Sequence, residues 1–179
     1  MNPNLFRILT LVLCIAFVSC SSDDTSSIPD ETNNAFTFNG NTYDLMSVII
    51  VDENTANNDP SDISISLFNK TSSEITSNND LSDINYVNFK IVDPTIQNTT
   101  YNEIDSYDVS INSSITNSEF TAGTVLLSDD DSQSDVYAQS GSVTVTNFTQ
   151  FNIVFTFSFT RNDGQVISGS YDGNYYMPN

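Results

Sequence analysis

The segment from Gln150 to Thr160, which reads QFNIVFTFSFT, restricts the fold of this chain more than any other segment. Every second side chain in it is large and apolar, and successive side chains of a β-strand point to opposite faces of a sheet. The segment is therefore expected to form a strand that covers the floor of a hydrophobic core with one of its faces. The residues of this face, which we call the phenylalanine strip, are Phe151, Ile153, Phe155, Phe157 and Phe159.

Shorter segments along the chain show the same two-residue period or runs of β-branched residues. Between residues 35 and 179, no segment longer than a few residues has the i, i+3, i+4 apolar spacing of a helix. We therefore predict an all-β domain over residues 35–179, with about eight or nine antiparallel strands in a β-sandwich or a β-barrel. The other predicted strands lie at 36–38, 41–52, 63–68, 85–92, 107–111, 119–128, 136–148 and 165–177.

Turn residues and glycines mark boundaries and bends of these strands. Asn39-Gly40 tolerates positive φ angles and predicts a two-residue hairpin turn. Gly123 predicts a bulge, and Gly169 and Gly173 predict a bend or a close backbone approach in the last strand. The regular spacing of hairpins favours an up-and-down barrel, whereas the long polar link over 69–83 favours a crossover between two sheets. The sequence leaves both arrangements open.

The amino-terminal segment has the order of features that is typical of a secretory signal. An apolar run from Ile8 to Val18 follows the charged Arg7 and precedes the small Ser19. The run is too short to span a bilayer, which takes roughly 20 apolar residues. We therefore expect residues 1–19 to be a signal peptide that is removed on export.

The signal ends in Phe17-Val18-Ser19-Cys20, which resembles the lipobox of bacterial lipoproteins. The resemblance implies that Cys20 becomes the first residue of the mature chain, with a diacylglycerol on its thiol and a fatty acid such as palmitate on its amino group. Several acyl chains together hold a protein durably on a membrane. The alternative is a secreted protein in which Cys20 is a free thiol.

The residues after Cys20, Ser21-Ser22-Asp23-Asp24, resemble the short acidic export signals of surface lipoproteins of the Bacteroidota type. This resemblance implies a lipid-anchored protein of the outer membrane that faces outward at the cell surface. Residues 20–34 contain hardly an apolar side chain, so they cannot bury enough surface to offset the entropy of ordering. We expect them to form a flexible tether between the membrane and the domain.

The charge balance excludes several classes of function. The chain has 23 acidic and 4 basic residues and a formal net charge of −19, so it lacks the Lys and Arg clusters that bind nucleic acid. It has no histidine, and its 2 cysteines are Cys14, within the signal peptide, and Cys20. The commonest general base, a thiolate nucleophile and a Cys or His metal site are therefore missing from the expected mature domain. We expect no enzymatic activity.

The acidic segment over 129–135 is the best candidate for a cofactor site. Ca²⁺ is bound by about six to eight oxygen ligands, many of them from closely spaced Asp and Asn residues. The spacing departs from the EF-hand pattern, because Gln133 and Ser134 stand where Asp or Asn and then Gly are needed. A solvated hairpin tip is the alternative, and the loop over 52–62 has the same two interpretations. The candidate Ca²⁺ ligands are Asp129, Asp130, Asp131 and Asp135.

Together these features predict a non-catalytic β-domain that binds or displays at the cell surface, with a protein or a glycan as its partner. Because the chain has no tryptophan, its 8 tyrosines are the main candidates for stacking on sugar rings. Two alternatives remain open. The phenylalanine strip could line a lipocalin-like cup that carries a small apolar ligand. A pair of carboxylates could instead make the domain a hydrolase that works without histidine.

Overall fold

The computed structural model describes residues 34–129 and 135–178. The predicted signal peptide, Cys20 and residues 20–33 of the predicted tether lie outside the described residues. In the part of the chain that is described, no helix is long and apolar enough to cross a membrane.

The described residues form an all-β structure, as the sequence predicts. The strands make one 12-stranded hydrogen-bonded sheet, and the one helix among the described residues lies between β4 and β5. The strands are β1 (Ala35–Phe38), β2 (Asn41–Asp44), β3 (Ser47–Asp52), β4 (Ser61–Phe68), β5 (Leu81–Asp93), β6 (Thr100–Tyr101), β7 (Ser106–Thr116), β8 (Glu119–Thr121), β9 (Thr124–Leu127), β10 (Ala138–Phe148), β11 (Asn152–Arg161) and β12 (Val166–Tyr176), and the helix is α2 (Ser72–Ile75).

The structure has three more strands than the nine predicted segments, because two of these segments are divided where the chain changes partners and because the short β6 pairs with β10. The predicted strand over 41–52 is divided into β2, which pairs with β1, and β3, which pairs with β4. At this break the Met46 N–H donates to the Phe68 carbonyl at 2.6 Å, which begins the pairing with β4. The predicted strand over 119–128 is divided into β8 and β9, which both pair with β7.

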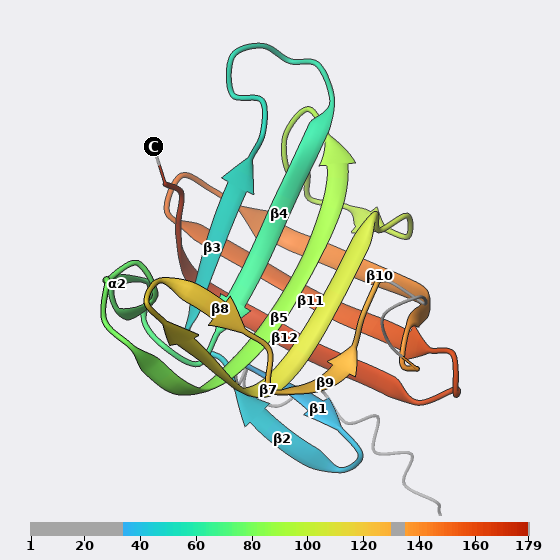
Figure 1. The fold of residues 1–179 in the computed structure, drawn as a ribbon. Helices are drawn as coiled ribbons and strands as arrows, with labels where there is room; N and C mark the ends of the chain where they lie inside the picture. The colour runs from blue at the N-terminus through green and yellow to red at the C-terminus, as the bar shows by residue number, and fades with distance from the viewer. Residues whose placement is uncertain (1–33, 130–134, 179) are drawn as a thin grey trace, which may run out of the picture. The chain divides into compact units, whose positions relative to one another are not determined.

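The sheet follows the order β6-β10-β11-β12-β3-β4-β5-β7-β8, and among the described strands this path is not closed. Neighbours along it are antiparallel, except that the end of β12 pairs in parallel with β3 at Val48 and Ile49. In Figure 1, β3, β4, β5 and β7 cross in front of β10, β11 and β12. Two parts of one sheet therefore face each other as layers.

The core lies between these two layers, and the phenylalanine strip is at its centre. The Phe155 ring of β11 lies 5.7 Å, centroid to centroid, from the Phe89 ring of β5 in the facing layer. The Phe159 ring lies 6.0 Å from the same Phe89 ring. The residues at 153, 155, 157 and 159 are all buried, which confirms that this segment floors a core.

The prediction that all five residues of the phenylalanine strip face the core is wrong for Phe151. Phe151 is 70% exposed and precedes β11, which begins at Asn152. The Thr149 N–H donates to the Asn152 carbonyl at 2.9 Å, and the Asn152 N–H donates to the Thr149 hydroxyl at 3.1 Å. These bonds close the turn between β10 and β11, so Phe151 lies in that turn, outside the core.

Two positions where the sequence requires unusual backbone freedom are confirmed. Asn39 and Gly40 have φ angles of 50° and 74° and form the turn between β1 and β2. A Cβ atom on Gly169 would lie 2.6 Å from the Ala35 carbonyl oxygen. Glycine at this position therefore allows β1 to pair closely with β12.

A second, smaller apolar cluster lies on the face of the β3-β4-β5-β7 layer that points away from the core. The link over 69–83 is mostly polar, but it contains the two large apolar side chains of Ile75 and Leu81. Both residues pack against this cluster, Ile75 from α2 and Leu81 from the start of β5. The other members of the cluster are Ile49, Phe68, Ile84, Tyr86 and Ile115.

Candidate functional site

Tyr86, Asp108 and Ser110 lie on the face of the sheet opposite the core, which we call the outer face. Residues that alternate with them along β5 and β7 are in the core, and successive side chains point to opposite faces. The register places Tyr86 opposite Ser110 and Asn88 opposite Asp108. Diagonal neighbours on one face of a sheet lie about 7 to 8 Å apart. Tyr86 and Asp108 are therefore neighbours, although they are far apart in the sequence.

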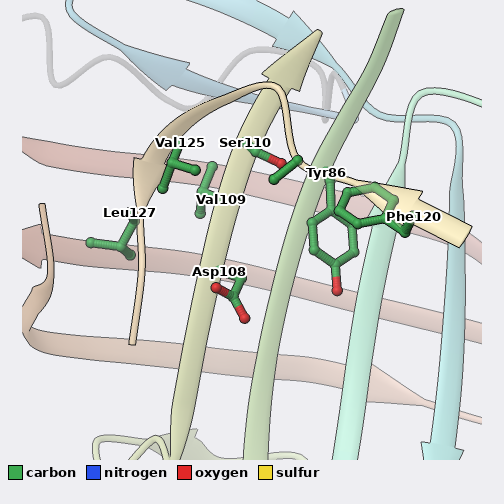
Figure 2. Close-up of a pocket in the computed structure, with 8 residues that line it drawn as sticks. Tyr86, Asp108, Val109, Ser110, Phe120, Val125 and Leu127 are labelled. Atoms are coloured by element: carbon green, nitrogen blue, oxygen red, sulfur yellow. The ribbon is translucent and has the colours of Figure 1, made fainter. Parts of the chain in front are cut away.

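These side chains border a pocket of about 260 Å³ on the outer face. Figure 2 shows the Tyr86 hydroxyl and the Asp108 carboxylate toward the same end of this pocket, with the Phe120 ring beside Tyr86. The lining combines two aromatic rings and several aliphatic side chains with one carboxylate and two hydroxyls. The residues that line this outer-face pocket are Tyr86, Asp108, Val109, Ser110, Phe120, Ala122, Val125 and Leu127.

The link between β8 and β9 closes one side of the outer-face pocket. The Phe120 ring centroid lies 4.7 Å from that of Tyr86, with 50° between the ring planes. The Gly123 N–H donates to the Ser113 hydroxyl at 3.1 Å, and an added Cβ atom at Gly123 would collide with the Asn112 carbonyl. Glycine therefore lets this link lie directly against β7. Gly123 serves a close backbone approach rather than the predicted bulge within one strand.

Hydrogen bonds on the outer face hold the polar side chains near the pocket in place. The Asn88 Nδ2 donates to the hydroxyls of Ser64 and Ser66, each at 2.8 Å. The Ser110 and Ser113 hydroxyls share a hydrogen bond at 2.8 Å. Because these residues belong to the paired strands β4, β5 and β7, the polar side chains beside the pocket are held in fixed positions.

Tyr86 supplies a neutral hydroxyl to the pocket. Burial raises the pKa of Tyr86 to about 12, a hydrogen bond with Ser66 opposes this rise, and the charge of Asp108 adds to it. The phenol therefore keeps its proton at neutral pH and can donate one hydrogen bond while it accepts others.

Asp108 supplies the charge of the pocket. Burial raises the pKa of Asp108 to about 6, and the negative charge of Asp129, which follows β9, adds to the rise. Lys90 lies on the same face of β5, but its Nζ pairs with Asp62 at 3.4 Å. At pH 7 the Asp108 carboxylate is therefore mostly ionised and partly buried, and no basic side chain of the described residues forms an ion pair with it.

The predicted Ca²⁺ site lies only partly within the described residues. Asp130 and Asp131 lie outside them, whereas Asp129 and Asp135 are described and exposed. The Asp135 carbonyl accepts a hydrogen bond from the Asn162 side chain at 3.1 Å. Across residues 34–129 and 135–178, no group of three or more Asp, Glu, His or Cys side chains is placed to hold a metal ion. Calcium binding by this segment stays a prediction.

The second acidic loop, over 52–62, uses its polar side chains within the loop. Asp52 Oδ1 accepts from the Asn54 N–H at 2.9 Å and from the Ser61 hydroxyl at 2.8 Å. Asn57 Oδ1 accepts from the Asp59 N–H at 2.8 Å. These hydrogen bonds join polar groups within the loop or at its two ends, as is typical of a solvated loop that is closed by its own side chains.

Sequence reasoning did not identify the outer-face pocket. Tyr86 and Asp108 occupy outward positions of predicted strands, where tyrosine and aspartate are ordinary residues. Phe120 lies in the predicted strand over 119–128, and nothing nearby in the sequence indicates that it meets Tyr86. An aromatic residue at an outward strand position is a weak signal for such a site.

Comparison with protein-family models, curated proteins and solved structures gave no match for this chain. The function of the pocket is therefore argued from its own chemistry.

Proposed function

We propose that this chain is a lipid-anchored protein of the outer surface whose β-domain is a non-catalytic binding module. The outer-face pocket is the observation that supports a binding role. A concave, mostly apolar site with a few fixed polar groups is typical of sites for small ligands or for single side chains of a partner. We take the fold to be of the two-layer sandwich kind, with the pocket on the outside of one layer.

The packing of the core supports a site on the outer face rather than inside the domain. The Phe157 ring stacks on Phe159 at 5.2 Å between centroids, and Phe155 lies 6.1 Å from Tyr171. These rings pack against one another and against Phe89 of the facing layer. A carrier of the lipocalin kind would need the same side chains to line an open cup.

The membrane anchor in this proposal comes from the lipobox-like segment that ends at Cys20. Growth with radioactive palmitate is expected to label the protein, and Cys20→Ser is expected to abolish the label and release the protein from the membrane fraction. Cys14→Ser is the matched control, because it removes a thiol from the expected signal peptide and leaves the anchor intact. Label that persists in Cys20→Ser would refute the anchor.

The binding role of the pocket can be tested with a panel of small sugars, amines and aromatic compounds, followed through the backbone amide resonances of the purified protein. Ligands are expected to shift the resonances of residues around Tyr86, Asp108 and Ser110. Phe120→Ala is expected to weaken such binding about tenfold, because it removes one ring of the pocket. Phe151→Ala is the control, because it also removes an exposed ring. Phe151 precedes β11, which is separated from the pocket strands β5 and β7 by several strands of the sheet. Shifts confined to other parts of the sheet would contradict the proposal.

One observation favours a carboxylate-dependent hydrolase as the second candidate. Asp108 has a raised pKa, and the charge of Asp129 acts on it. Glycoside hydrolases use one carboxyl group that keeps its proton and a second that is ionised. Release of nitrophenol from nitrophenyl glycosides that disappears in both Asp108→Asn and Asp129→Asn would favour this function over simple binding.

A further inference from the structure

We propose that the outer-face pocket binds an organic ammonium group, which forms an ion pair with Asp108 and lies against the rings of Tyr86 and Phe120. This inference rests on the proposed binding role of the pocket and specifies the chemistry of its ligand.

The first argument is the charge of Asp108, which has no counterion within the described residues. Lys90 pairs with Asp62 at 3.4 Å, and Arg161 pairs with Asp163 at 2.7 Å. Lys70 lies at the start of the link that contains α2, where hydrogen bonds with Thr71 and, to a lesser extent, the charge of Lys70 lower the pKa of Glu74. A partly buried carboxylate that lacks a cation is costly, and a ligand that carries the cation removes this cost.

The second argument is the pair of aromatic rings beside the carboxylate. Tyr86 and Phe120 meet at 4.7 Å with a tilt of 50°, so their faces do not cover each other completely. Phe120 is 41% exposed, which leaves ring surface open toward the pocket. The face of an aromatic ring attracts a cation, and an ammonium group held between a carboxylate and such faces is stabilised by both.

The third argument concerns the rest of the ligand. Ala122 and Val125 provide aliphatic surface, and the space of about 260 Å³ holds a short alkyl chain or a single sugar ring. An anionic ligand is disfavoured by Asp108, by the nearby Asp129 and by a chain with a net charge of −19. Lysine side chains of a partner protein and amino sugars share the required chemistry.

The groups that influence Asp108 also predict how binding depends on pH. Tyr86 and Lys90 of β5 lie on the same outer face of the sheet as Asp108 of β7, and Asp129 follows β9. Tyr86 keeps its proton between pH 5 and 8, because burial raises its pKa to about 12. Because the pKa of Asp108 is about 6, its carboxylate is ionised at pH 7.5 and mostly protonated at pH 5. Affinity for an ammonium ligand should therefore fall as the pH is lowered.

The test uses the full chain in detergent micelles, titrated with four probes while its backbone amide resonances are recorded. Nα-acetyl-lysine amide and glucosamine carry the ammonium group, and Nα-acetyl-norleucine amide and glucose are their neutral counterparts. We expect an ammonium probe to shift the pocket resonances and to bind at least about tenfold more tightly than its counterpart. The lysine and glucosamine arms distinguish a protein partner from an amino sugar.

Two variants and a change of pH make the test specific. Asp108→Asn should reduce the affinity for the ammonium probes about tenfold, and lowering the pH from 7.5 to 5 should have a similar effect on the unmodified protein. Asp44→Asn, at the exposed end of β2, removes the same charge away from the pocket and should leave the affinity unchanged. Equal binding of charged and neutral probes at the pocket, unaffected by Asp108→Asn, would overturn the ammonium inference but keep the binding role. If none of the probes shifts the pocket resonances, both proposals fail.

Discussion

At the scale of single residues, Asp108 is a side chain whose partial burial opposes folding at neutral pH. Its partly buried position favours the protonated carboxyl and raises its pKa to about 6, above the ordinary value of 3.8. In the unfolded chain the same carboxyl is ionised at a lower pH. The folded state therefore binds more protons than the unfolded state between these two values. Stability contributed by this group falls as the pH rises through that window, and the loss is complete above pH 6.

Asp108→Asn is therefore expected to stabilise the protein at pH 7.5. The gain should be about 1 kcal/mol, or about 3 °C in Tm, after allowance for the screening of a partly exposed group by water. At pH 4 the gain should vanish, because the carboxyl of the unmodified protein is then protonated in the folded state. Thermal unfolding at the two pH values measures both effects, and Asp44→Asn controls for net charge. A variant that is less stable than the original at pH 7.5 would show that Asp108 is tied into the fold by a favourable contact.

At the scale of elements, β11 shows both the strength and the limit of periodic patterns. Alternation correctly identifies Ile153, Phe155, Phe157 and Phe159 as the core face, because successive side chains of any strand point to opposite sides. The same alternation includes Phe151, which follows the rule in sequence but lies in the turn before β11. Hydrogen bonds between Thr149 and Asn152 close the turn that precedes β11, and the apolar pattern does not indicate where this turn lies.

Two matched substitutions separate the core from the turn. Phe157→Ala is expected to lower the free energy of unfolding by about 3 to 5 kcal/mol, because it leaves a cavity beside Phe159 and Phe89. Phe151→Ala, which removes the same ring at an exposed position, should change it by less than about 0.5 kcal/mol. Urea unfolding of both variants measures the difference, and Phe157→Leu provides a milder change if the alanine variant does not fold. Similar losses for Phe151 and Phe157 would mean that the turn is packed against other residues.

At the scale of the whole described domain, Arg161 ties together strands from both layers. Its Nη1 donates to the Leu126 carbonyl of β9 at 3.0 Å, and its Nη2 pairs with Asp163 at 2.7 Å. Its guanidinium also lies 5.0 Å from the ring centroid of Phe38 on β1. The planar fork of arginine can serve these partners together, whereas the single ammonium of lysine cannot. Leu126 neighbours Val125 and Leu127, which line the outer-face pocket, so this tie also supports one side of the pocket.

Arg161→Lys is accordingly expected to lower the free energy of unfolding by about 2 kcal/mol. Hydrogen exchange of the amides of β9 should also become faster, because the strand loses its attachment to β11. The control is Lys90→Arg, which keeps the charge of a half-buried pair with Asp62 and should change stability by less than about 0.5 kcal/mol. Unchanged exchange in β9 of the Arg161→Lys variant would show that pairing with β7 alone holds this strand.

Much of this protein is encoded in residues that are adjacent along the chain. The two-residue period makes the segments around Ile63 and Phe155 strands, Asn39-Gly40 makes a hairpin turn, and the scarcity of helical spacing makes the domain all-β. Each of these features depends on the conformational preferences of a few neighbouring residues, so it can be predicted without knowledge of the rest of the chain.

Long-range pairing decided the rest. Residues 41–52 divide between two layers because β2 pairs with β1 while β3 pairs with β4. Tyr86, Asp108 and Phe120 form a pocket because the register between β5 and β7, and the close approach at Gly123, bring three distant segments together. Register and strand order are set by the burial of apolar side chains across the whole sheet. The free energy of this burial depends on residues that are far apart in the sequence, so no single segment predicts it.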